Sequence, residues 1–406
     1  MLKRLGVVLS AVTLLATGCA QEDGQEAGGE KVTVQIDGKT DQFAAEITAF
    51  FPKELSVRPG SSVDFELPTF SGGPHTVTFG TLVDAAVRKL GQLGPQASLN
   101  DVEESTEMLK VVDVFFHEPP PPGPPKLNQS AAQPCFLATG NPPGVVDRGK
   151  QPWLVGGAAA CEQQEQTEFD GKQTFFNSGA LFEDGASFTL DLSDDIEPGT
   201  YNFMCLIHRG AMTGKLNVVE EGQDVPDAAQ VRSQGRQEFD SLIERLQPAF
   251  DQVQEATPEN AVAGTGVPEA GEAVVAEFGP KEFSIPVGGT VSWKLFFFHT
   301  IAFNATEEDI GLLQKAPDGS IGLNPKIAPA NSAPPPEVTA FFPPPRGSKP
   351  LTIDGGDWNG EGFRASGLLG SVPPLIITYT TKFTKAGTVR FQCQVHPDMK
   401  GQVRVG

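Results

Sequence analysis

Histidine, cysteine and methionine recur in two matched sets along the chain of 406 residues, which contains only five of each. The two sets are His75, Cys205, His208 and Met212, and His299, Cys393, His396 and Met399. Two imidazoles, one thiolate and one thioether are the ligand group of a type-1 blue copper site, in which the Met is a long and weak axial ligand. Zinc prefers a closed tetrahedron of N and S ligands and rarely recruits Met. The residue types therefore predict two copper ions per chain.

The spacing within each set has a geometric reason. Cys, His and Met follow one another in CLIHRGAM and in CQVHPDM, so one strand end and the loop behind it bring all three to one ion. The other His, in PHTVTF or FHTIAF, comes from a different strand and is therefore distant in sequence. A lone His is usually structural and a lone Met usually packs, and we interpret His117, the fifth imidazole, as a structural or surface residue. Two complete sets that use four of the five histidines instead indicate metal ligation.

Three pairs of segments match between the two halves of the chain, in the same order. Residues 50–65 (FFPKELSVRPGSSVDF) align without a gap with residues 278–293 (FGPKEFSIPVGGTVSW), and each segment predicts two strands joined by a tight Gly turn. The other matches are residues 198–218 with 386–405, and residues 178–181 with 366–369. The chain therefore contains a duplicated β-domain with one donor set in each copy.

Both ligand loops resemble the C-terminal ligand loop of the cupredoxin family, which includes plastocyanin, azurin and amicyanin. The patterns are Y-N-F-x-C-x-x-H-x-x-x-M-x-G-x-x-x-V in the first half and F-x-C-x-x-H-x-x-M-x-G-x-x-x-V in the second. The resemblance implies a Greek-key β-sandwich in each half, an electron-carrying role, and copper ligation by both sets. The first His precedes the Cys by 130 positions in the first half and by 94 in the second. Because family members place the two much closer together, both halves must carry a large insertion.

We expect an all-β protein, with two tandem Greek-key β-sandwich (cupredoxin) domains, large loop or helical insertions and a helical linker. The expected segments are a signal peptide at 1–18, a lipidated Cys and flexible tether at 19–31, the first domain at 32–220, a partly helical linker at 221–269 and the second domain at 270–406. The linker has apolar residues at helical spacing over residues 224–260, with a kink or break expected at Pro248. In the insertions, residues 81–110 look partly helical, and residues 306–314 look like the start of a helix.

The N-terminal segment MLKRLGVVLSAVTLLATGC has two basic residues, an apolar stretch and small residues before a cysteine, which is typical of a secretory signal. Its end also resembles a bacterial lipobox, which predicts that Cys19 carries a lipid; ordinary cleavage is the alternative. We therefore expect an extracytoplasmic protein held by its N-terminal lipid on the outer face of the cell membrane or in the periplasm. Disulfides form in such compartments, so Cys135 and Cys161 are predicted to be bonded, with two free thiols as the alternative.

The excess of acidic over basic residues limits the kinds of molecule that the protein can be expected to bind. The chain has 51 acidic and 30 basic residues and a formal net charge of -21, which becomes -23 when the leader with Lys3 and Arg4 is removed. Nucleic acid is disfavoured because its binding relies on clusters of Lys and Arg. An acidic surface instead favours a basic redox protein such as a cytochrome, or a membrane oxidoreductase.

Three functions are compatible with two copper sites. We favour an electron carrier in which each copper cycles between Cu(I) and Cu(II), with electrons leaving through a partly exposed edge of His208 or His396. A copper-binding or copper-delivery lipoprotein without redox turnover is the alternative. A copper enzyme such as a nitrite reductase or multicopper oxidase is disfavoured, because only His117 is spare and the chain has no His-x-His pair. Three residues separate His208 from Met212 and two separate His396 from Met399, so the two reduction potentials are expected to differ.

Overall fold

The protein is seen in a computed structural model, which describes residues 31–94, 101–102, 105–117, 126–127, 129–132, 168–267, 271–315, 321–327, 349–371 and 376–406. The predicted signal peptide, Cys19, the predicted disulfide between Cys135 and Cys161, and the proline runs lie outside these residues. Within the described part of the chain, no helix combines the length and apolar character needed to cross a membrane.

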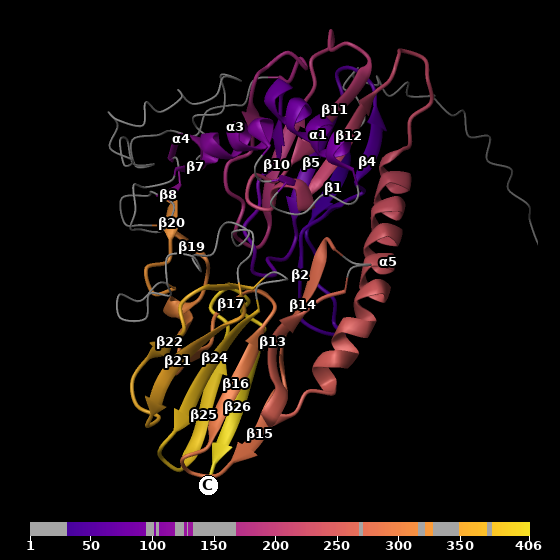
Figure 1. The fold of residues 1–406 in the computed structure, drawn as a ribbon. Coiled ribbons are helices and arrows are strands. Elements are labelled where there is room, and N and C mark those ends of the chain that lie inside the picture. The colour runs from indigo at the N-terminus through magenta and orange to yellow at the C-terminus, as the bar shows by residue number, and fades with distance from the viewer. Residues whose placement is uncertain are drawn as a thin grey trace, which may run out of the picture.

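The first domain is a sandwich of two sheets, at the top of Figure 1. One sheet has the strand order β10-β5-β1-β3 and the other has the order β4-β12-β11-β6-β9. Its strands are β1 (Val32–Ile36), β3 (Phe50–Phe51), β4 (Glu54–Val57), β5 (Ser62–Leu67), β6 (Thr78–Phe79), β9 (Phe176–Asn177), β10 (Ala186–Asp191), β11 (Gly199–Met204) and β12 (Thr213–Val218). Phe65 of β5 and Phe203 of β11 meet edge to face between the sheets, with ring centroids 5.2 Å apart.

The second domain repeats this arrangement below the first. Its sheets have the orders β2-β14-β13-β16-β24-β21 and β15-β26-β25-β18-β22. Its strands are β13 (Ala261–Thr265), β14 (Ala273–Gly279), β15 (Glu282–Ile285), β16 (Thr290–Leu295), β18 (Ala302–Phe303), β21 (Leu351–Trp358), β22 (Arg364–Ala365), β24 (Ile377–Phe383), β25 (Gly387–Gln392) and β26 (Lys400–Val405), joined by β2 (Ala45–Ile47) of the first half. Trp293 of β16 packs on Phe391 of β25 across the core, with ring centroids 5.3 Å apart. Short two-stranded pairs are β17 (Phe297–His299) with β23 (Leu369–Ser371), β19 (Leu313–Lys315) with β20 (Ile321–Leu323), and β7 (Phe116–His117) with β8 (Lys126–Leu127).

The repeat found in the sequence is a repeat of strand pairing. β1 lies parallel to β5 as β13 lies parallel to β16, and β4 lies parallel to β12 as β15 lies parallel to β26. Alternate residues of β5 and of β16 are buried, because every second side chain of a strand points to the same face. The predicted all-β class with two β-sandwiches is confirmed.

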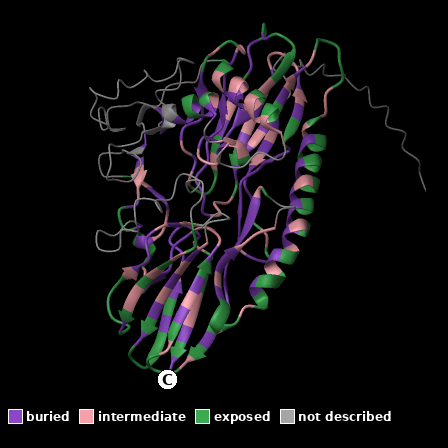
Figure 2. Cartoon of the chain, in the orientation of Figure 1, coloured by how far each residue is buried: buried purple, intermediate pink, exposed green. Residues whose placement is uncertain are grey.

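The linker is the helix α5 (Ala228–Gln254), which runs beside both domains in Figure 1. Asp227 caps its first turn in a capping box with Gln230. Figure 2 shows a buried stripe along the helix and an exposed opposite side. Of the kink or break expected at Pro248, the break is not found, because the helix continues and buries Leu246, Ala249 and Val253 on either side of the proline. Burial of this apolar face outweighs the hydrogen bond that the proline cannot donate.

The strand β2 crosses from one domain to the other. It belongs to the first half of the sequence, yet it pairs antiparallel with β14 at the edge of the second domain's sheet. Hydrogen bonds from Thr48 to the Glu272 carbonyl and from the Ala44 amide to the Glu277 carboxylate extend this contact on both sides. The two sandwiches are therefore joined by backbone pairing as well as by α5.

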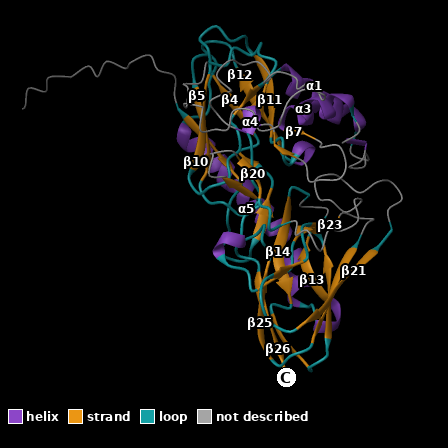
Figure 3. Cartoon of the chain, turned by 90° about the vertical axis from the view of Figure 1, so that its left-hand side faces the viewer, coloured by secondary structure: helices purple, strands orange, loops and turns teal. Residues whose placement is uncertain are grey.

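The insertions follow the predictions only in part. Residues 81–110 were expected to be partly helical, and α1 (Thr81–Leu93) and α3 (Thr106–Phe115) lie together beside the first sandwich, followed by the short α4 (Gln129–Ala132) (Figure 3). The prediction that a helix starts at residue 306 is wrong, because only a single turn forms there. A 3-10 turn, Glu307–Asp309, forms with a capping box between Thr306 and Asp309, and Gly311 follows with a φ of 104°. That left-handed backbone ends the turn before a helix can continue.

We expect Leu246→Ala to destabilise the protein by about 2–5 kcal/mol, because it leaves a cavity where α5 packs against both domains. The matched variant Glu244→Ala changes an exposed residue of the same helix and should alter the free energy of unfolding by no more than about 0.5 kcal/mol. Urea unfolding followed by circular dichroism measures both. Equal small effects of the two variants would contradict a structural role for this helix face.

Candidate metal centres

The first donor set lies where the first-domain sandwich meets the second domain. His75 forms an antiparallel bridge to Leu181 through two backbone hydrogen bonds of 2.8 Å, and Cys205 directly follows β11. The loop from Cys205 closes on itself, since the Cys205 amide donates to the Met212 carbonyl at 3.0 Å. His208 begins the 3-10 turn Arg209–Ala211 inside this loop. One bridged segment and one closed loop thus supply the four side chains.

Distances show that the predicted members of the first set are together. His75 Nδ1 lies 3.2 Å from Met212 Sδ, and Cys205 Sγ lies 3.5 Å from His208 Nδ1. The ligand atoms of His75, Cys205 and His208 all lie within 4.8 Å of one another. His75, Cys205 and Met212 are buried.

The second set has the same arrangement in the second domain. His299 ends β17, and its Nδ1 lies 3.1 Å from His396 Nδ1 and 3.8 Å from Cys393 Sγ. Cys393 Sγ lies 3.4 Å from His396 Nδ1. The Cys393 amide donates to the Met399 carbonyl at 2.9 Å, which closes the loop, and the Met399 side chain is buried.

The donor chemistry fits a soft transition-metal ion. Bonds of about 2.0–2.3 Å to N and S ligands separate neighbouring donors by roughly 3–4 Å, which is the range found between the Nδ1 and Sγ atoms of both sets. Burial alone raises the pKa of the two thiols, but the imidazoles of His208 and His396 outweigh it and hold the pKa of Cys205 and Cys393 well below the ordinary value. Both cysteines are therefore ready to act as thiolates, the form that binds metal.

A threonine holds each thiolate in place, and neither of these two residues was predicted from the sequence. The Thr76 amide donates to Cys205 Sγ at 3.3 Å, and the Thr76 hydroxyl accepts from the Leu206 amide at 2.8 Å. In the second domain the Thr300 amide donates to Cys393 Sγ at 3.4 Å, and its hydroxyl accepts from the Gln394 amide at 2.7 Å. The signal was present in the sequence, because a His-Thr pair occurs in PHTVTF and in FHTIAF.

The repeated Ser-Gly segment supports the strand that carries the first His. The Ser178 hydroxyl accepts from the Val77 amide at 2.8 Å, and the Ser366 hydroxyl accepts from the Ile301 amide at 2.9 Å. Each serine thus lies against the residue two positions after His75 or His299. The matched segments at 178–181 and 366–369 therefore have a structural role beside the candidate metal centres.

The surroundings of the Nε2 atom differ between His75 in the first domain and His299 in the second. His75 Nε2 lies 3.3 Å from the buried Asp37 carboxylate, whereas His299 Nε2 has no hydrogen-bond partner among the described residues. Strand pairing places Gly264 at the position of Asp37, and both have a left-handed backbone, with φ of 72° and 59°. A Cβ on Gly264 would lie only 2.1 Å from His299 Nε2. The second domain therefore has no room for the carboxylate that the first domain provides.

The ring edges of His208 and His396 were expected to be partly exposed to solvent, and this prediction is wrong. Their side chains are 9 % and 1 % accessible, because the two ligand loops face each other across the domain interface. Glu46 of β2 lies between them, with Oε1 3.3 Å from His208 Nε2 and Oε2 2.8 Å from His396 Nε2. Burial and the neighbouring thiolate act in opposite directions on each imidazole, and the thiolate and Glu46 raise the pKa of both histidines to about 10.

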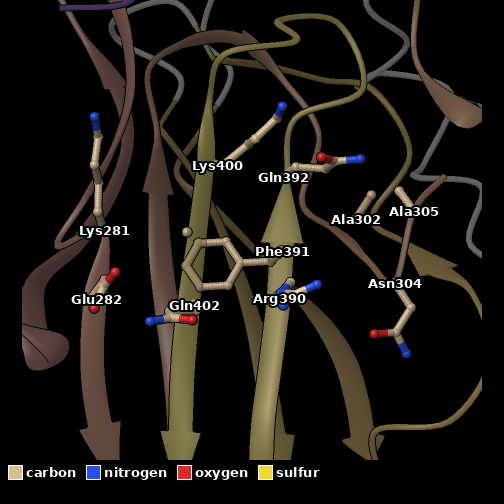
Figure 4. Close-up of a pocket in the computed structure, with 11 residues that line it drawn as sticks. Lys281, Glu282, Ala302, Asn304, Ala305, Arg390, Phe391, Gln392, Lys400 and Gln402 are labelled. Atoms are coloured by element: carbon tan, nitrogen blue, oxygen red, sulfur yellow. The ribbon is translucent and has the colours of Figure 1, made fainter. Parts of the chain in front are cut away.

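A hollow with cationic side chains lies next to the second donor set, since its lining residues Gln392 and Lys400 are the chain neighbours of Cys393 and Met399. It has a volume of about 510 Å³ and lies on the second domain beside β15, β25 and β26. Figure 4 shows Lys281, Arg390 and Lys400 around Phe391 in this hollow. None of its lining residues belongs to a donor set.

No protein-family model matches the chain. No curated protein matches it either. Solved structures do match, at low identity. The chain is similar to a purple cupredoxin from Nitrosopumilus maritimus, with 17% identity over 36% of this chain and 99% of that one and a TM-score of 0.16.

Two further structures extend this comparison. Auracyanin A, a blue copper protein from Chloroflexus aurantiacus, is 15% identical over 46% of this chain and 98% of its own, with a TM-score of 0.21. A copper-containing nitrite reductase from Thermus scotoductus SA-01 is 13% identical over 93% of this chain and 68% of its own, with a TM-score of 0.22. Because these identities and TM-scores are low, the arrangement of the donors is described from the contacts within this chain alone.

We expect Asp37→Asn to raise the reduction potential of copper in the first set while leaving the second set unchanged. A carboxylate beside His75 favours Cu(II), and a tenfold change in the preference between Cu(II) and Cu(I) corresponds to about 60 mV. Voltammetry on the variants Cys393→Ser and Asp37→Asn/Cys393→Ser reads the first set alone. An unchanged potential in the second of these would show that Asp37 does not tune the site.

Proposed function

We propose that the protein is an electron carrier with two type-1 copper sites, one in each β-sandwich. The observation that carries the proposal is the convergence of two His, Cys, His sets, buried except for the partly buried His208, each with its ligand atoms within 4.8 Å and each with a buried Met in the same loop. His75, Cys205, His208 and Met212 would hold one ion, and His299, Cys393, His396 and Met399 the other. Copper bound there would accept and release one electron by cycling between Cu(II) and Cu(I).

The chain's own residues supply what such a site needs. Thr76 and Thr300 fix the thiolates by backbone hydrogen bonds, and the closed loops fix the second imidazoles. Water is excluded because Cys205 and Met212 belong to the first hydrophobic core, and Cys393 and Met399 belong to the second. Rigid and dry donors limit the rearrangement that accompanies a change of charge.

The alternatives require features that these sets do not offer. A copper-delivery protein needs a site that exchanges its ion, whereas seven of the eight side chains are buried and the eighth, His208, is only 9 % accessible. A catalytic copper needs further histidines, and the sequence has only His117 to spare. An electron carrier that is not itself an enzyme therefore agrees best with the donors at hand.

The partner and the location belong to the same proposal. A net charge of -21 favours a basic redox protein such as a cytochrome, or a membrane oxidoreductase with a basic docking face. The lipobox-like end of the leader supports an extracytoplasmic protein tethered through Cys19. With the imidazole edges buried, a partner would approach other parts of the two domains.

We expect Cu(II) added to the purified protein to produce an intense blue band, bleached by reductant, with about two coppers bound per chain. Cys205→Ser and Cys393→Ser should each remove about half of the band, and the double variant should remove it. Visible absorption and metal analysis measure these outcomes. A colourless protein, or colour that persists in the double variant, would overturn the proposed function.

We expect Cys19→Ser to move the protein from the membrane fraction to the soluble fraction of cells that express it, because the lipid attachment site is lost. Ala20→Ser changes the neighbouring residue and should leave the protein with the membranes. Immunoblots of the separated fractions measure the distribution. Equal distributions of both variants and the parent chain would contradict the anchor.

A further inference from the structure

Glu46 comes from the first half of the sequence, but its strand is part of a sheet of the second domain. It lies in the middle of β2, where it pairs with Val274 at the edge of the second domain's sheet. Its residue exposure is only 4%, so the carboxylate is enclosed between the two sandwiches. A buried charge of this kind is costly unless it is paired and hydrogen-bonded.

The partners of Glu46 are one histidine from each donor set. Oε1 lies 3.3 Å from His208 Nε2, and Oε2 lies 2.8 Å from His396 Nε2. In the neutral form that binds metal, an imidazole that donates its Nε2 proton to a carboxylate presents its Nδ1 lone pair on the other side. In both histidines that Nδ1 atom is the one nearest the cysteine sulfur, at 3.5 Å and 3.4 Å. A single carboxylate therefore orients two rings toward two different thiolates.

The segment before His75 closes the space around Glu46. A Cβ on Gly73 would lie 2.8 Å from Glu46 Oε1 and 3.1 Å from the His208 ring. A Cβ on Gly72 would lie 2.6 Å from the Val395 carbonyl and 2.7 Å from the His396 ring. The Gly-Gly pair thus lies directly on both ligand loops, and its lack of side chains lets the two domains approach.

We propose that Glu46 is a shared positioning residue that couples His208 of the first donor set to His396 of the second, so that a change at one of these two histidines is felt at the other set. This inference rests on the proposed function for the identity of the metal, while the shared carboxylate rests on the contacts alone. His75 and His299 lack such a link among the described residues, because Asp37 contacts only the first set and Gly264 leaves no side chain at the second. Glu46 gives the two sets a route by which they can influence each other through hydrogen bonds.

The main test is Glu46→Gln, read separately at each set with Cu(II) as the probe. A glutamine turns its NH₂ group toward one Nε2–H, so that contact is lost, and its uncharged oxygen makes a weaker hydrogen bond to the other Nε2–H than the carboxylate does. Carboxylates that orient metal-binding histidines contribute about 10- to 100-fold to metal affinity. We expect a loss of this size in both the Cys393→Ser background, which keeps the first set, and the Cys205→Ser background, which keeps the second.

Two control variants separate positioning from general damage. Asp37→Asn should affect the first set alone. Glu272→Gln removes another carboxylate at the domain interface, which contacts Lys53 and Arg245 but no donor, and should affect neither set. Loss at only one set in Glu46→Gln, or equal losses in Glu272→Gln, would overturn the inference.

Coupling itself is tested with a double-mutant cycle. In the Cys205→Ser background, His208→Phe removes one partner of Glu46 without touching the second set, and the reduction potential of copper in that set should shift. The same His208→Phe change should have no further effect in a chain that already carries Glu46→Gln. An unshifted potential, or a shift of the same size in the chain with Glu46→Gln, would argue against coupling through this carboxylate.

A measurement on the metal-free protein needs no variant and no copper. Both Nε2 protons, of His208 and of His396, should be protected from solvent exchange and visible in ¹⁵N-resolved NMR spectra, because each is held by the buried carboxylate. Absence of protection at either ring would overturn the shared contact even if the protein turns blue. Protection at both rings in a protein that binds no copper would support the contact and reject only the proposed function.

Discussion

Both donor sets depend on a reciprocal pair of hydrogen bonds between the strand of the first His and the loop of the Cys. The threonine after the His donates its amide to the thiolate, and its hydroxyl accepts from the amide that follows the Cys. This pair sets how far the loop lies from the strand, and so it determines where the imidazoles meet the sulfur. A thiolate stripped of water needs such donors, because an unsatisfied buried charge is strongly unfavourable. The sandwich behind the pair supplies the apolar surroundings, since the cysteines and methionines are part of its core.

Duplication kept this pair and changed what surrounds it. In the first domain, Met204 and Leu206 on either side of Cys205 pack into the cluster formed by α1 and α3. In the second domain, the Gln394 side chain donates instead to the Asp309 carbonyl of the 3-10 turn, at 2.9 Å. The two insertions thus support the two ligand loops by apolar packing in one case and by a hydrogen bond in the other. Together with Asp37 opposite Gly264, these differences give two sets of equal composition unequal environments.

The donors could be predicted from the sequence because their residue types are scarce. Five histidines in 406 residues, four of them in register with a repeat, leave few arrangements to consider. The strands of both sandwiches were predictable for a similar reason, because β5 and β16 alternate apolar and polar residues at the same offset. Glu46 was not predictable in this way, since it is one of 51 acidic residues and its position depends on the pairing of β2 with the other domain. Its one local signal is that it is the sole charged residue between Phe43 and Phe51, an otherwise mostly apolar stretch.

The burial of His208 and His396 follows from how the domains are joined. β2 fixes one side of the interface by backbone pairing, α5 fixes another by packing against both sandwiches, and Gly72 and Gly73 let the ligand loops come together. None of these contacts involves a donor atom, so the arrangement of the loops is set by the scaffold before any ion binds. An interface held in this way covers the Nε2 edges of His208 and His396. It also places one carboxylate between a histidine of each donor set, so the surroundings of both sets depend on the pair of domains and not on either sandwich alone.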